Sequence, residues 1–182
     1  MFPTKFHQTS LAPRELNSMQ RQVLILSEDQ CYSDSMRLLL ESSLKYFVCQ
    51  ISEHENYRQF LKVVNSGVVI LEFDSNMLSF TALRNELKAL KLAPKLLLIL
   101  NDQQMHFIPQ ILEIGTEAII TKGDDLHRLV QIIDIVNSGH SYLSQKVINY
   151  LVKKSVKDGH SELTQREYEV LVLLGKGLSY NA

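Results

Sequence analysis

Five short apolar runs, each followed by an amphipathic stretch, constrain the fold of this chain most. The runs are 22–26, 46–51, 68–71, 95–100 and 117–121. Runs of this length and hydrophobicity are typical of strands buried on both faces of a parallel sheet. The stretches between them carry apolar residues at helical spacing, which predicts a helix after each strand. In the first of these helices, the buried stripe is predicted to contain Tyr32, Met36, Leu39 and Leu40. The alternation predicts an α/β domain with a five-stranded parallel sheet and helices on both faces.

The chain is divided by the same pattern into four segments. We predict a polar tail at 1–20, the α/β domain at 21–140, a linker helix within 141–161, and the start of another helical unit at 162–182. The formal net charge is −1, whereas a DNA-binding module usually has a basic surplus. Two cysteines and six scattered histidines show no metal-ligand spacing, so we expect no metal and no cofactor.

The last segment resembles the start of a LuxR-type helix-turn-helix domain. That family begins with leucine and threonine, any residue, arginine and glutamate, a valine-leucine helix, a glycine and a serine. The matching residues are Leu163, Thr164, Arg166, Glu167, Val170, Leu171, Gly177 and Ser179. Thr164 and Glu167 also form a capping-box pattern. In helix-turn-helix proteins the second helix reads DNA. We expect this chain to stop before that helix, so that only the full-length protein binds DNA specifically.

Residues 21–140 resemble the receiver domain of response regulators, which has a flavodoxin-like doubly wound fold. The segment from Ile114 to Lys122 is similar to the glycine-to-lysine segment of receivers, with Lys122 as their characteristic lysine. The resemblance implies a phosphorylation pocket at the carboxyl ends of the strands. In a working receiver an aspartate after the third strand accepts the phosphoryl group. An acidic pair holds magnesium, and a lysine and a serine or threonine contact the phosphoryl oxygens.

Most of these pocket positions carry the wrong residue here. Ser27 and Glu28 occupy the positions of the acidic pair, with Asp29 next. Glu72 occupies the acceptor position, with Asp74 two residues later. Leu100 occupies the serine or threonine position, and Ile119 occupies the position of the aromatic switch. We therefore predict a degenerate receiver that aspartyl phosphorylation does not switch. A Glu72–Lys122 pair would either imitate the phosphorylated state or form an inert salt bridge. Phosphorylation of Asp74 or Glu72 remains the alternative.

A second family motif is also altered. The subgroup of biofilm-matrix activators with degenerate receivers binds cyclic di-GMP through tryptophan, an apolar residue, threonine or serine, and arginine. The matching residues are Tyr142, Leu143, Ser144 and Gln145. The replacement of arginine by glutamine removes the charge that a phosphate ligand needs. We therefore expect Tyr142 and Leu143 to pack, Ser144 to cap the next helix, and no small-molecule ligand to bind. A cyclic di-GMP response remains an alternative.

Pro109 lies inside the expected fourth helix, where it is tolerated only in the first turn. We predict a short helix starting near Ile108, preceded by a loop. Because this face usually carries receiver dimer contacts, we expect a homodimer through another surface, with Ile132 and Ile135 as candidates. The equal alternative is that both residues belong to the core.

Taken together, these features predict a dimeric LuxR-type transcriptional regulator, with control of biofilm or matrix genes as a further hypothesis. A protein-interaction module without DNA function is the other class of function. An enzyme is not expected, since no glycine-rich nucleotide loop, P-loop or nucleophile elbow occurs. The chain has no apolar signal segment and no run of membrane-spanning length, so we expect a cytoplasmic protein without membrane contact.

Overall fold

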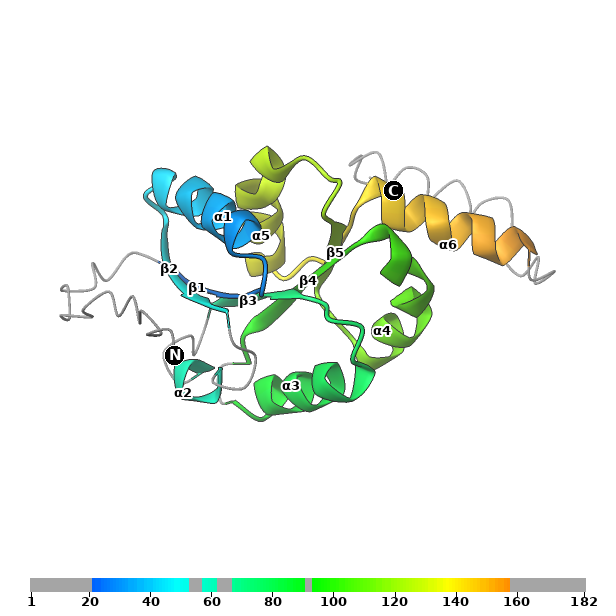
Figure 1. The fold of residues 1–182 in the computed structure, drawn as a ribbon, viewed down its shortest axis with the longest axis horizontal. Helices are drawn as coiled ribbons and strands as arrows, with labels where there is room; N and C mark the ends of the chain where they lie inside the picture. The colour runs from blue at the N-terminus through cyan, green and yellow to red at the C-terminus, as the bar shows by residue number, and fades with distance from the viewer. Residues whose placement is uncertain (1–20, 53–56, 62–66, 91–92, 158–182) are drawn as a thin grey trace, which may run out of the picture.

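The computed structural model describes residues 21–52, 57–61, 67–90 and 93–157. They form a parallel sheet in the order β2-β1-β3-β4-β5-β6 (Figure 1). The strands are β1 (Arg21–Leu26), β2 (Tyr46–Ile51), β3 (Val68–Glu72), β4 (Lys95–Leu100), β5 (Ala118–Thr121) and β6 (Tyr142–Leu143). The five predicted strands are confirmed. The two-residue β6, which pairs with β5, makes the sheet six-stranded.

Helices cover both faces of the sheet. They are α1 (Gln30–Ser42), α2 (Arg58–Leu61), α3 (Met77–Ala89), α4 (Ile108–Ile114), α5 (Leu129–Asn137) and α6 (Gln145–Lys157), with 3₁₀ helices η2 (Asp102–Phe107) and η3 (Leu126–Arg128). Helices α1 and α5 lie on one face, and α3 and α4 lie on the other (Figure 1). The doubly wound arrangement predicted from the alternation is therefore confirmed. No helix in the described ranges is long and apolar enough to cross a membrane.

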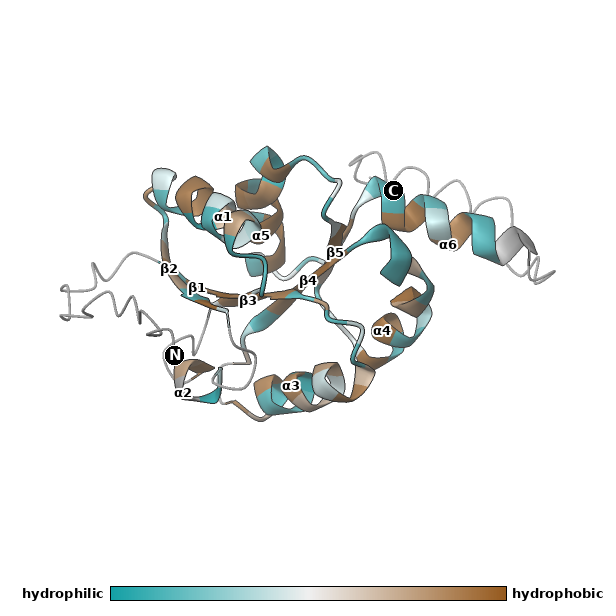
Figure 2. Cartoon of the chain, viewed as in Figure 1, coloured by the Kyte–Doolittle hydropathy of each residue, from teal (hydrophilic) through white to brown (hydrophobic). Residues whose placement is uncertain are grey.

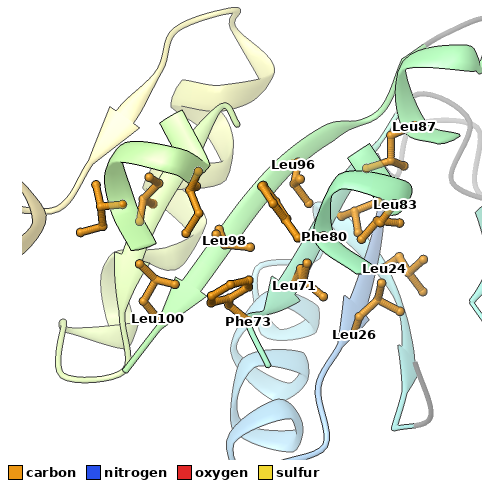
Figure 3. Close-up of a cluster of buried hydrophobic side chains, with 14 of the residues drawn as sticks. Leu24, Leu26, Leu71, Phe73, Phe80, Leu83, Leu87, Leu96, Leu98 and Leu100 are labelled. Atoms are coloured by element: carbon orange, nitrogen blue, oxygen red, sulfur yellow. The ribbon is translucent and has the colours of Figure 1, made fainter. Parts of the chain in front are cut away.

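Two apolar cores form because successive side chains of a strand point to opposite faces. In β1, Val23 and Ile25 belong to the core under α1 and α5, whereas Leu24 and Leu26 belong to the core under α3 and α4. Figure 2 shows apolar strands between helices whose apolar residues face the sheet. Figure 3 shows the core under α3 and α4, in which the Phe80 and Phe73 rings meet edge-on. The centroids of the two rings are 6.0 Å apart.

The fourth helix begins at Ile108, as predicted, with Pro109 in its first turn. The segment before it is the 3₁₀ helix η2, so the prediction of a loop there is wrong. Asn101 and Gln104 form a capping box at the start of η2, which satisfies backbone N–H groups that a loop would leave free. Pro109 is tolerated at the start of α4, because an N–H in the first turn of a helix has no partner inside that helix and proline has no N–H.

One of the two candidate dimer residues lies in the core. Ile132 is only 3% exposed and packs with Leu129, Ile133 and Val136, so its assignment to a dimer surface is wrong. Helix α5 buries a wide stripe because it lies across the sheet, and Ile132 falls within that stripe. Ile135 is 37% exposed and remains available on the outer side of α5.

The linker region begins as part of the domain. Residues 142–143 form β6, and Val147 and Ile148 in the first turn of α6 are buried in the described structure. Helix α6 then runs to Lys157. The predicted tail at 1–20 and the helix-turn-helix residues at 162–182 lie outside the described residues.

Candidate functional site

The candidate site lies where three strands end at the same edge of the sheet. Ser27 directly follows β1, Glu72 is the last residue of β3, and Lys122 directly follows β5. The carboxyl ends of parallel strands meet at one edge, and this edge is where doubly wound folds bind ligands. The fold therefore brings together residues that are 45 and more positions apart in the sequence.

Both carboxylate oxygens of Glu72 are engaged in this pocket. Oε1 lies 2.5 Å from Nζ of Lys122, and Oε2 accepts a hydrogen bond from Oγ of Ser27 at 2.5 Å. Glu72 is only 20% exposed at the side chain, and Ser27 is buried. The carboxylate at the acceptor position is thus held by a cation on one oxygen and a hydroxyl on the other.

Asp29 is the second acidic partner of Lys122. Its Oδ2 accepts from Lys122 Nζ at 2.9 Å, and its Oδ1 accepts from the backbone N–H of Tyr32 at 3.0 Å, which caps α1. The hydrogen bond from Lys122, followed by that from Tyr32, holds the pKa of Asp29 below its ordinary value. Partial burial opposes a rise in the pKa of Lys122, but its hydrogen bonds to Glu72 and Asp29 outweigh burial and raise this pKa.

Tyr32 is a site residue that sequence reasoning assigned only to the buried stripe of α1. The Lys122 ammonium lies 5.2 Å from the centre of the Tyr32 ring, a distance at which the ring face attracts a cation. Burial raises the pKa of Tyr32 to about 12, so the phenol stays neutral. Its hydroxyl is buried and has no hydrogen-bond partner among the described residues. The signal available in the sequence was the spacing of three residues from Asp29.

Four predicted pocket residues lie elsewhere. Glu28 is exposed, and Asp74 is exposed with its Oδ1 accepting from the Asn76 N–H at 2.8 Å. Leu100 and Ile119 are fully buried in the core under α3 and α4. Their alternation along β4 and β5 directs them to that core, so neither forms part of the polar pocket.

A magnesium ion, which receiver-like pockets hold, does not fit the residues present. Ser27 replaces one carboxylate, Glu28 is exposed, and Asp29 is committed to α1 and Lys122. In the described ranges no three histidine, cysteine or acidic side chains are grouped where they could hold a metal.

The segment at the altered cyclic di-GMP motif is built into the sheet. The N–H groups of Tyr142 and Ser144 donate to the carbonyls of Glu117 and Ile119, each at 2.9 Å. Tyr142 and Leu143 are half-buried, and Gln145 donates to Asn149 at 3.0 Å. The expectation that Ser144 caps α6 is wrong for its side chain. Its carbonyl accepts from the Ile148 N–H, whereas its buried hydroxyl has no partner among the described residues. Pairing of β6 with β5 fixes the backbone there and encloses the hydroxyl.

The charge of Asp29 can be tested with Asp29→Asn, because asparagine also caps helices well. We expect the free energy of unfolding to fall by less than about 1 kcal/mol, because the pair with Lys122 is partly exposed. The folded-state pKa lies below the ordinary 3.8, so the carboxylate stabilises above that value and ceases to do so as pH falls through the folded pKa. The difference between variant and parent should be constant well above pH 3.8 and should shrink as pH falls below 3.8 and through the folded-state pKa.

Urea unfolding at each pH measures this difference. Asp74→Asn is the control, since asparagine can still accept from the Asn76 N–H and Asp74 contacts no lysine in the described structure. A difference for Asp29→Asn that grows towards acid pH would contradict the assignment.

The chain is similar to known proteins over most of its length. No family model matches the chain. Fimbriae Z protein of Salmonella typhimurium is 21% identical over 161 residues, which are 86% of this chain and 77% of that protein. Transcriptional regulatory protein DegU of Brevibacillus brevis is 22% identical over 187 aligned positions, covering 91% of this chain and 79% of that protein.

Solved structures show the same fold. A LuxR-family two-component response regulator from Aurantimonas aligns with a TM-score of 0.64 at 16% identity, covering 75% of this chain and 99% of that chain. The response regulator RcsB in its complex with DNA aligns with a TM-score of 0.65 at 15% identity, covering 88% of this chain and 79% of that chain. The described part of the chain therefore has the doubly wound fold seen in solved response regulators.

Proposed function

We propose that this chain is a LuxR-type transcriptional regulator whose receiver-like domain is controlled without aspartyl phosphorylation. The observation that carries the proposal is the occupied carboxylate of Glu72, held between Lys122 and Ser27. The similarity to DegU, named as a transcriptional regulatory protein, and to RcsB, solved with DNA, supports the regulatory role. A regulator of this kind acts where the DNA is, so we place it in the cytoplasm.

Phosphoryl transfer needs an acceptor oxygen that is free and correctly placed, because positioning and charge stabilisation provide most of the catalysis. The extra methylene of glutamate displaces the carboxylate relative to aspartate, and both oxygens already have partners. Leu100 has no hydrogen-bond donor for a phosphoryl oxygen. The site lacks the acidic pair that would hold magnesium. We therefore propose that the Glu72–Lys122 pair keeps the pocket in a single conformation that phosphorylation does not change.

The proposal includes a homodimer, with Ile135 on the outer side of α5 as a candidate contact. It also includes biofilm or matrix genes as targets, for which the similarity to Fimbriae Z protein gives support. An input by cyclic di-GMP is disfavoured, because three of the four motif positions are half-buried or buried in the sheet and at the start of α6.

The test is incubation with acetyl phosphate and magnesium, followed by intact mass and sedimentation. We expect no phospho-adduct and a dimer whose dissociation constant the donor does not change. Selection of genomic DNA fragments by the protein expressed from its own gene should recover specific sites without any phosphoryl donor. A stable adduct on Glu72 or Asp74, located by peptide mapping, would establish a phosphoryl-accepting regulator instead. Failure to select any DNA, with dimerisation intact, would favour an interaction module.

A further inference from the structure

The start of the linker is held to the domain by a small set of contacts. We call residues 142–148, together with their partner Asp102, the linker latch. Strand β6 contributes the two backbone hydrogen bonds from Tyr142 and Ser144 to the β5 region. Lys146 in α6 forms an ion pair with Asp102 in η2. Val147 and Ile148 add buried apolar surface.

The latch contains an unfavourable group alongside these favourable ones. The hydroxyl of Ser144, a residue that is 2% exposed, has no hydrogen-bond partner among the described residues. A buried hydroxyl without a partner destabilises the closed arrangement, because it would be hydrated if the segment came away. The Asp102–Lys146 pair is largely exposed and therefore stabilises only weakly. The closed latch thus combines a weak ion pair and the burial of Val147 and Ile148 with the cost of an unpartnered hydroxyl.

The backbone before the latch turns sharply where α5 ends. Gly139 has a φ of +91°, a conformation that favours glycine, and the N–H groups of Gly139 and His140 donate to the carbonyls of Val136 and Ile135, which caps the helix. It separates α5, whose apolar stripe is part of the core, from the two-residue β6. The latch also borders the candidate site. Leu143 of β6 pairs with Ile119 of β5, and Lys122 directly follows β5.

We propose that the linker latch opens and closes as a unit against β5 while β1 to β5 remain folded. This inference goes beyond the proposed function. It identifies a two-state element that sets the position of α6 without any phosphoryl group. Opening would free the edge of β5 and the apolar first turn of α6. The Asp102–Lys146 pair favours the closed state, and the Ser144 hydroxyl favours the open state.

Hydrogen exchange followed by mass spectrometry on the full chain tests this directly, with no DNA and no phosphoryl donor present. Peptides that cover 142–148 should exchange faster than peptides from β3 and β4. Asp102→Asn should raise latch exchange roughly two- to fivefold, the range expected from loss of an exposed ion pair. Ser144→Ala should slow latch exchange at least about fivefold, because it removes the unpartnered hydroxyl from the closed state.

Glu86→Gln is the matched control, because it breaks an exposed ion pair with Arg58 that does not involve the latch. It should leave exchange at 142–148 unchanged. Latch peptides that exchange together with β3 and β4 in every variant would overturn the proposal, as would faster exchange in Ser144→Ala. Because these readouts involve neither DNA nor phosphorylation, they are independent of the tests of the proposed function.

Discussion

Replacing Glu117 with alanine is expected to lower the free energy of unfolding by about 3–5 kcal/mol, the cost of leaving a buried charge without its partner. The Arg84 side chain is only 9% exposed, and its Nη2 and Nη1 donate to the two Glu117 oxygens at 2.8 and 3.2 Å. Glu117 Oε2 also accepts from the backbone N–H of Leu96 at 2.7 Å. One carboxylate thus joins α3, β4 and the start of β5.

Urea unfolding of parent and variant measures the effect. The double variant Arg84→Met/Glu117→Leu should be destabilised much less than Glu117→Ala, because replacing a whole buried ion pair with apolar side chains is often close to neutral. Glu86→Ala, which removes the exposed partner of Arg58, should change the free energy of unfolding by less than about 1 kcal/mol. A Glu117→Ala variant as stable as Glu86→Ala would show that Arg84 finds another partner or becomes hydrated.

The contribution of Glu117 illustrates what the sequence could not predict. Arg84 and Glu117 are 33 positions apart and lie on different elements, so no local pattern relates them. Strand β6 has only two residues, too few for a periodic signal, and it was assigned to the linker. Tyr32 was predicted to be inward-facing, but its position over Lys122 depends on how α1 crosses the end of β5.

The fold and the centre of the site were predictable for a physical reason. Apolar runs such as 68–71 and 96–100 are typical of strands covered on both faces, which favours a parallel sheet with crossover helices. Once that sheet is inferred, the polar residues directly after its central strands must lie at one edge. The resemblance to receivers then assigned Ser27, Asp29, Glu72 and Lys122 to the pocket, whereas Leu100 and Ile119, which it also aligned with pocket positions, belong to a core.

The largest functional effect is expected from rebuilding the pocket. The double variant Ser27→Asp/Glu72→Asp should accept a phosphoryl group from acetyl phosphate and magnesium on most chains, whereas the parent should show no adduct by intact mass. The shorter aspartate withdraws the carboxylate from the position at which Lys122 and Ser27 now hold both oxygens. The aspartate at 27 supplies an oxygen ligand of the kind magnesium prefers.

The single variant Glu72→Asp separates acceptor length from the rest of the pocket and should remain unlabelled, because it still lacks the carboxylate at position 27. Ser27→Asp alone should also remain unlabelled, because Glu72 still displaces the acceptor carboxylate. Labelling of Glu72→Asp alone would mean that the glutamate methylene is the sole block and that Asp29 or Glu28 can serve the metal. An inert double variant that unfolds cooperatively would mean that Tyr32, packed over Lys122, closes the pocket to the donor, and Tyr32→Ala in that background would then restore labelling.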